Sequence, residues 1–77
     1  MDAFIREFEA SIEELEPGSV TAETRFQDME QWDSLAVLTT IAMADAEFEV
    51  ELTANEILAC TTIQDLAELV QRKRTAG

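Results

Sequence analysis

The first apolar residues of the chain recur at steps of three and four, the period of one face of an α-helix. Charged residues, including Glu9, fill the opposite side. Pro17 and Gly18 follow and indicate a helix end, because proline cannot continue the hydrogen-bond ladder and glycine suits the turn after a helix. We therefore predict an amphipathic helix over residues 3–15. Its apolar face consists of Phe4, Ile5, Phe8, Ile12 and Leu15.

The segment from Pro17 to Asp33 shows no sustained period, which predicts a long connection. A structureless loop of this length is unusual in a small domain unless it is functional or its own side chains hold it in place. Four apolar residues are candidates for that holding role: Val20, Phe26, Met29 and Trp32.

Residues 33–48 are predicted to form a second helix. Asp33 stands at its start, where an aspartate side chain caps free backbone amides. Residues 47–52 then alternate charged and apolar side chains, which is the period of a β-strand. A strand this short would have no partner, so we predict an extended link.

Two capping patterns predict two further helices. Thr53 and Glu56 have the T-x-x-E spacing of a capping box and introduce the apolar residues 57–58. Thr62 precedes the last helix, which we expect to fray near its basic end, residues 72–74. Those charges complement the negative pole of the helix dipole. The sequence thus predicts an all-α fold, a small four-helix bundle with a long loop between helices 1 and 2.

The second predicted helix has two apolar faces. One stripe should face the core and contains Val37, Ile41, Ala44 and Phe48. The nearly opposite side, beside Asp45, contains Leu35, Leu38 and Ala42. The pattern alone favours packing of this second face under the long loop or against another helix. The alternative is a partner-docking patch, since an exposed apolar cluster with an acidic rim suits transient protein contacts.

Ser34 follows the capping aspartate and has two interpretations as well. Serine at a helix start is ordinary capping chemistry. A hydroxyl exposed at a helix N-terminus is also in a place where the dipole and free amides tolerate a phosphate. The chain has no histidine to act as a base, so another protein would have to activate Ser34.

Composition excludes most enzyme chemistry. The 77 residues include no histidine, one cysteine and two glycines. Histidine-dependent triads and zinc sites, an intrachain disulfide and glycine-rich nucleotide loops are therefore absent. Cys60 is expected to be a buried apolar residue. The acidic residues near Asp45 lack the order of a calcium loop, so no metal site is predicted.

The chain is strongly acidic, with 17 acidic and 5 basic residues and a net charge of −12. This balance argues against nucleic acid as a ligand and favours basic partner surfaces. No apolar run approaches the roughly 20 residues of a membrane span, and the N-terminus lacks the basic flank of a signal peptide. We expect a soluble cytoplasmic protein, a monomer, with residues 1–77 forming a single domain.

The stretch Trp32-Asp33-Ser34-Leu35 resembles the D-S-L modification motif of acyl carrier proteins. The resemblance continues through Glu47-Phe48, the link Glu49-Val50-Glu51-Leu52, and Thr61-Thr62-Ile63 before the last helix. It also covers the first helix, the long loop with Phe26, the acidity and the length. The resemblance therefore extends over nearly the whole chain.

The resemblance implies a four-helix carrier whose Ser34 receives a 4′-phosphopantetheine arm from coenzyme A through a separate transferase and Mg²⁺. Asp33 would cap the helix and be recognised by that transferase. The arm's thiol would hold an acyl or aminoacyl group as a thioester for acyl-loading and acyl-processing enzymes, and the carrier itself would catalyse nothing. By position, Leu35, Leu38, Ala42 and Asp45 match the family's partner-facing surface.

The sequence departs from the family pattern in two places. Gln31 stands where glycine is common, and the bulky Trp32 after it is expected to pin the loop. Ala36 and Thr39 stand where many fatty-acid carriers have acidic residues, which favours a dedicated biosynthetic pathway. The competing hypothesis is an unmodified acidic adaptor that binds a basic protein. The sequence leaves the cargo, the pathway and any burial of the acyl chain in the bundle open.

Overall fold

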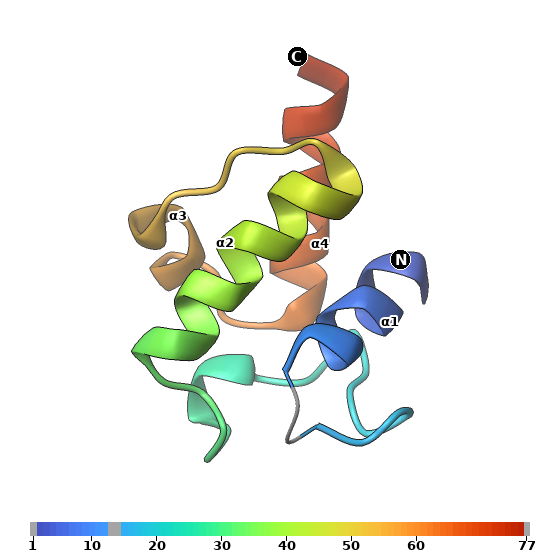
Figure 1. The fold of residues 1–77 in the computed structure, drawn as a ribbon, viewed down its shortest axis with the longest axis vertical. Helices are drawn as coiled ribbons and strands as arrows, with labels where there is room; N and C mark the ends of the chain where they lie inside the picture. Colours follow the sequence, from blue (N-terminus) through green and yellow to red (C-terminus); the bar gives the residue numbers. More distant parts are fainter. Residues whose placement is uncertain (1, 13–14, 77) are drawn as a thin grey trace.

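The computed structural model describes residues 2–12 and 15–76 and contains four α-helices and one short 3-10 helix within them (Figure 1). The elements are α1 (Asp2–Ser11), η1 (Phe26–Asp28), α2 (Ser34–Phe48), α3 (Ala54–Leu58) and α4 (Ile63–Ala76). No β-strand occurs among the described residues. The predicted all-α fold with a long loop between the first two helices is confirmed. Helix α2 contacts each of the other three helices.

Helix α1 is shorter than predicted. It ends at Ser11, whereas the apolar period extends to Leu15, which packs at the edge of the core outside the helix. At its end, the Ser11 hydroxyl donates to the Phe8 carbonyl at 2.9 Å and so competes with the backbone ladder. The Leu15 amide then donates to the Ile12 carbonyl at 3.0 Å, three residues back instead of the four of an α-helix. Residues 13 and 14 of the predicted helix lie outside the described residues.

The long loop is tied to α1 by a buried carboxylate. Glu9 is 6% exposed, and its Oε2 accepts hydrogen bonds from the amides of Gly18 at 3.0 Å and Val20 at 2.9 Å. The prediction that Glu9 lies on the solvent side of the helix is therefore wrong. A buried carboxylate is tolerated here because two backbone donors satisfy it.

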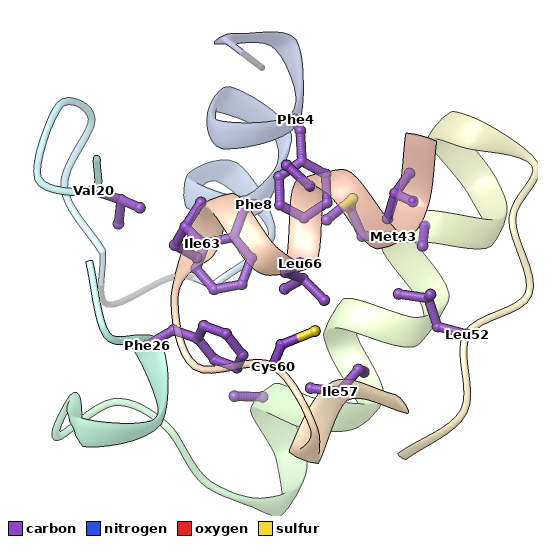
Figure 2. Close-up of a cluster of buried hydrophobic side chains, with 14 of the residues drawn as sticks. Phe4, Phe8, Val20, Phe26, Met43, Leu52, Ile57, Cys60, Ile63 and Leu66 are labelled. Carbon is purple, nitrogen blue, oxygen red and sulfur yellow. The ribbon is translucent and has the colours of Figure 1, made fainter. Parts of the chain in front are cut away.

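Aromatic side chains hold the second half of the loop against the core. Phe26 is fully buried, and its ring lies 4.8 Å from that of Trp32 and 6.4 Å from that of Phe8. Figure 2 shows Phe26 entering the core from the loop toward the side chains of α4. The predicted loop anchors are confirmed, because Val20 is buried and Met29 and Trp32 pack against the core.

The core face of α2 is rotated from the predicted stripe. Its buried residues are Ala36, Thr40, Met43 and Ala44. Of the predicted stripe only Ala44 is fully buried, while Val37, Ile41 and Phe48 pack at the edge of the core. Thr40 can occupy the centre because its hydroxyl donates to the Ala36 carbonyl at 2.8 Å, which satisfies the polar atom.

The link after α2 is extended, as predicted. It begins at Glu49, which has a left-handed backbone with φ 56°, and its apolar residues Val50 and Leu52 are buried. Helix α3 then begins with the predicted capping box. The Thr53 hydroxyl accepts from the Glu56 amide, and the Glu56 carboxylate accepts from the Thr53 amide.

Side chains from two other elements hold the short helix α3. The Gln27 amide nitrogen donates to the carbonyls of Leu58 at 3.1 Å and Ile57 at 3.3 Å, and also to that of Cys60. At the other end of α3, Lys73 of α4 forms an ion pair of 2.6 Å with Glu56. The basic residues at the end of α4 therefore make tertiary contacts in addition to any favourable interaction with the helix dipole.

The start of α4 is capped by Asp65, together with the predicted Thr62. The Asp65 carboxylate accepts from the amides of Thr61 and Thr62, and the Thr62 hydroxyl accepts from the Asp65 amide. The helix continues to Ala76, slightly beyond the predicted fraying point. The guanidinium of Arg74 lies over the Phe48 ring, 5.7 Å from its centroid, and ties the end of α2 to α4.

Candidate functional site

Asp33 fixes the first turn of α2 and with it the position of Ser34. Its backbone is extended, its Oδ1 accepts from the Ala36 amide at 2.9 Å, and its carbonyl accepts from the Val37 amide at 3.1 Å. The predicted cap is therefore present. Ser34 is the first helical residue and is exposed. The Asp33 side chain thus makes the cap, and the Ser34 hydroxyl stays at the solvent-exposed start of the helix without taking part in capping.

The surroundings of Ser34 suit a phosphate diester. The amides of Ser34 and Leu35 have no hydrogen-bond partner among the described residues, as expected for the first amides of a helix. The first turn of α2 contains no acidic residue, so within that turn only the capping Asp33 adds negative charge next to an attached group. Free amides and the positive end of the dipole favour an anion.

Two leucines of α2 project into solvent beside Ser34. Leu35 is 70% exposed and Leu38 is 63% exposed, and Ala42 and Asp45 are exposed on the same side. The interpretation that this face packs under the long loop or another helix is therefore wrong. We call these four residues the α2 surface. Large exposed apolar side chains gathered on one helix are characteristic of contact surfaces.

Leu58 is a third exposed leucine, 58% exposed, and its exposure was not predicted from the sequence. It follows Ile57, which is fully buried on the core face of α3. A five-residue helix turns only one narrow face to the core, so its neighbouring apolar residue must point elsewhere. The short length of the predicted helix could therefore have indicated that Leu58 is exposed.

A cavity of about 350 Å³ lies beside Ser34, between the end of α1 and the start of α2. Asp33 and Leu35, the two neighbours of Ser34, line it together with Gln31, Ser11 and Thr39. Gln31 therefore has a definite place in the structure. It lines the cavity next to the candidate attachment point.

Cys60 is 8% exposed, and its thiol contacts the Glu56 carbonyl at 3.5 Å. Burial is the main cause that raises the pKa of this thiol, and nearby Asp65 acts in the same direction. The prediction of a small buried apolar residue is confirmed. A reactive thiol on this chain would have to come from an attached group.

The described residues bring no three carboxylate or thiol ligands together into a group that could hold a metal ion. Asp45, Glu47, Glu49 and Glu51 are all exposed. None of the described helices combines the length and apolar character needed to cross a membrane.

Comparison with known proteins now identifies the family. The family model described as "Phosphopantetheine attachment site" matches residues 3–70. The solution NMR structure of holo acyl carrier protein from Geobacter metallireducens aligns with a TM-score of 0.78 and 25% sequence identity. The alignment covers 97% of this chain and 85% of that one. No curated protein matches the chain.

These findings confirm the resemblance seen in the sequence. The fold is that of acyl carrier proteins, and the family is defined by a covalently attached 4′-phosphopantetheine. Proteins of this kind carry a group for biosynthetic enzymes and have no catalytic activity of their own. The chain belongs to the phosphopantetheine attachment family and is a carrier domain of the acyl carrier protein type.

Proposed function

We propose that the protein carries acyl or aminoacyl intermediates as thioesters on a 4′-phosphopantetheine arm attached to Ser34. The observation that carries this proposal is the exposed Ser34 hydroxyl at the capped start of α2, in a chain that belongs to the family. Residues 1–77 form one carrier domain, and the protein acts in the cytoplasm as a monomer.

Attachment forms one phosphate ester bond, to the Ser34 oxygen, and breaks the phosphoanhydride bond of coenzyme A. The Ser34 oxygen attacks the phosphorus that bears the pantetheine in coenzyme A, the bond to the second phosphate breaks, and adenosine 3′,5′-bisphosphate leaves. A phosphopantetheinyl transferase with Mg²⁺ removes the hydroxyl proton, because the carrier has no histidine. On the carrier side, Asp33 holds the turn that presents the hydroxyl and contributes to recognition by the transferase.

The α2 surface is the proposed contact area for the transferase and for acyl-loading and acyl-processing enzymes. Leu35 and Leu38 supply its apolar centre, and Asp45 supplies its charge. The first turn of α2 contains no acidic residue, so contacts near the arm depend mainly on apolar packing. This property favours partners from a dedicated biosynthetic pathway over those of the general fatty-acid synthase.

Intact-protein mass spectrometry tests the attachment. The purified chain is incubated with coenzyme A, Mg²⁺ and a broad-specificity transferase, in parallel with Ser34→Ala and the matched control Ser19→Ala, whose serine is exposed in the loop. We expect one added phosphopantetheine on wild type and Ser19→Ala and none on Ser34→Ala. Modification of Ser34→Ala, or no gain on a folded wild type with several transferases, would contradict the proposal.

Variants of the α2 surface test partner contact separately. Leu38→Asp should slow modification by the transferase, while the circular dichroism spectrum should stay unchanged because the side chain is 63% exposed. The matched control is Leu58→Asp, which makes the same substitution at an exposed leucine on α3, outside the α2 surface. Equal rates for Leu38→Asp and wild type would remove α2 from the contact area. Salt-sensitive binding to a basic protein that survives Ser34→Ala would support the adaptor hypothesis instead.

A further inference from the structure

We propose that the resting arm on Ser34 lies in a groove between α1 and α2, with its thiol end near Ala42 and Ala46. This inference rests on the proposed attachment to Ser34 and adds a site for the arm on the carrier's own surface. Three observations support it. Two hollows adjoin between α1 and α2, their combined length matches that of the arm, and their lining residues suit its chemistry.

The proximal part of the groove is the 350 Å³ cavity beside Ser34. It is flanked by Asp33 and Leu35, the residues on either side of the attachment point. Three further polar residues, Ser11, Gln31 and Thr39, belong to its lining. This cavity therefore lies next to the attachment point, within reach of an arm on Ser34.

The distal part is a shallow surface depression of about 330 Å³ between α1 and α2, wide open to solvent. Ser11 and Thr39 line both cavities, so the two adjoin along the helix pair. Its apolar lining consists of three alanines, Ala10, Ala42 and Ala46, and of the buried Met43. The short alanine side chains leave the space that the arm would occupy.

The length of the groove agrees with the length of the arm. Along α2, the rise from Ser34 to Ala42 is about 12 Å and that from Ser34 to Ala46 is about 18 Å, at ~1.5 Å per residue. Phosphopantetheine has 13 chain bonds from phosphorus to sulfur, which extend about 15 Å if three bonds span ~3.5 Å as in an extended peptide. An extended arm that runs parallel to α2 therefore ends at a level between these two alanines.

The chemistry changes along the groove in the same order as along the arm. Pantetheine has a hydroxyl and two amides along its chain. The Gln31 and Thr39 side chains can donate and accept, and the Ser11 hydroxyl, which donates to the Phe8 carbonyl, can accept. At the distal end, Glu7 and Glu47 line the cavity beside the alanines. Their carboxylates disfavour a cargo with a negative charge and favour a neutral or ammonium-bearing one.

Isotope-filtered NMR on the holo protein tests the inference. The chain is labelled with ¹³C and ¹⁵N and carries an unlabelled arm, and mass spectrometry first verifies one arm per chain. We expect cross-peaks from the arm's geminal methyls to Thr39 and from its thiol-end methylenes to Ala42 and Ala46. Arm contacts confined to residues 33–35, or directed to α3 around Ile57, would overturn the groove and leave the attachment intact. No mass gain would overturn both.

A groove-filling variant provides the second readout. Ala10 is exposed and lines the distal part, so Ala10→Phe should abolish the distal cross-peaks while one arm per chain is still attached. The matched control is Ala54→Phe, an exposed alanine at the start of α3 that lines neither cavity. It should leave the cross-peaks unchanged. Persistence of the distal contacts in Ala10→Phe would overturn the proposed path of the arm.

Discussion

Replacement of Glu9 by glutamine should destabilise the protein, although it lowers a large net negative charge. The Glu9 carboxylate is buried and accepts two backbone hydrogen bonds, from Gly18 and Val20. A hydrogen bond to a charged group contributes about 1.5–3 kcal/mol and a neutral one about 0.5–1.5. Loss of the charge therefore costs about 1 kcal/mol per bond and about 2 kcal/mol in total.

That loss is large relative to the whole stability of the domain. At about 0.05–0.15 kcal/mol per residue, a chain of this size has roughly 4–12 kcal/mol of unfolding free energy. A loss of about 2 kcal/mol should lower the melting temperature by about 8–16 °C in a domain this small. Glu9→Ala should be worse, because the buried Val20 amide would lose its acceptor altogether.

Thermal and urea denaturation followed by circular dichroism at pH 7 measure the effect. The matched control is Glu16→Gln, since Glu16 is exposed in the loop and the substitution removes the same charge. In a chain with a net charge of −12, that removal alone should be neutral or slightly stabilising. If Glu9→Gln were as stable as Glu16→Gln, the two hydrogen bonds would not hold the loop as described.

Two further predictions concern titratable groups near α4. The amides of Thr61 and then Thr62 donate to Asp65 and lower the pKa of its carboxyl below the ordinary 3.8. Stability from this group is present above that value and lost as the pH falls through the folded pKa, so Asp65→Asn should lose less unfolding free energy than wild type between about pH 5 and 2. Equal acid sensitivity would contradict this assignment. Cys60 should resist iodoacetamide at pH 8, because burial raises the pKa of its thiol. Mass spectrometry should find no adduct on the folded chain without the arm and one on the holo chain, and a Cys60 adduct without unfolding would refute the buried position.

The parts of the fold that sequence could predict are those with local causes. The Asp33 cap, the Thr53–Glu56 capping box and the exposed Ser34 each depend on residues within one helical turn. Such patterns depend little on distant contacts, so the second and third helices begin where predicted. The proposed role of Ser34 came from the family resemblance, because capping chemistry alone did not select it.

The errors arise where distant contacts decide the outcome. Glu9 has the polarity of a surface residue, and its partners lie 9 and 11 residues later in a loop without periodicity. Thr40 also appeared polar, but a hydrogen bond to its own helix permits full burial and shifts the core face of α2. The burial of Glu9 and of Thr40 leaves no trace in the hydrophobic periodicity of the sequence, so the pattern could not predict either. The groove between α1 and α2 depends on how two helices pack, which the sequence pattern does not specify.

The contacts of Gln27 have a consequence for how the molecule opens locally. A five-residue helix such as α3 is not stable alone, because too few hydrogen bonds offset its nucleation. Gln27 in η1 holds its last carbonyls, and Lys73 in α4 holds Glu56 near its start. Disruption of η1 therefore removes support from α3 even if α2 and α4 remain folded. In hydrogen exchange, η1 and α3 should behave as one cooperative unit, less protected than the longer helices.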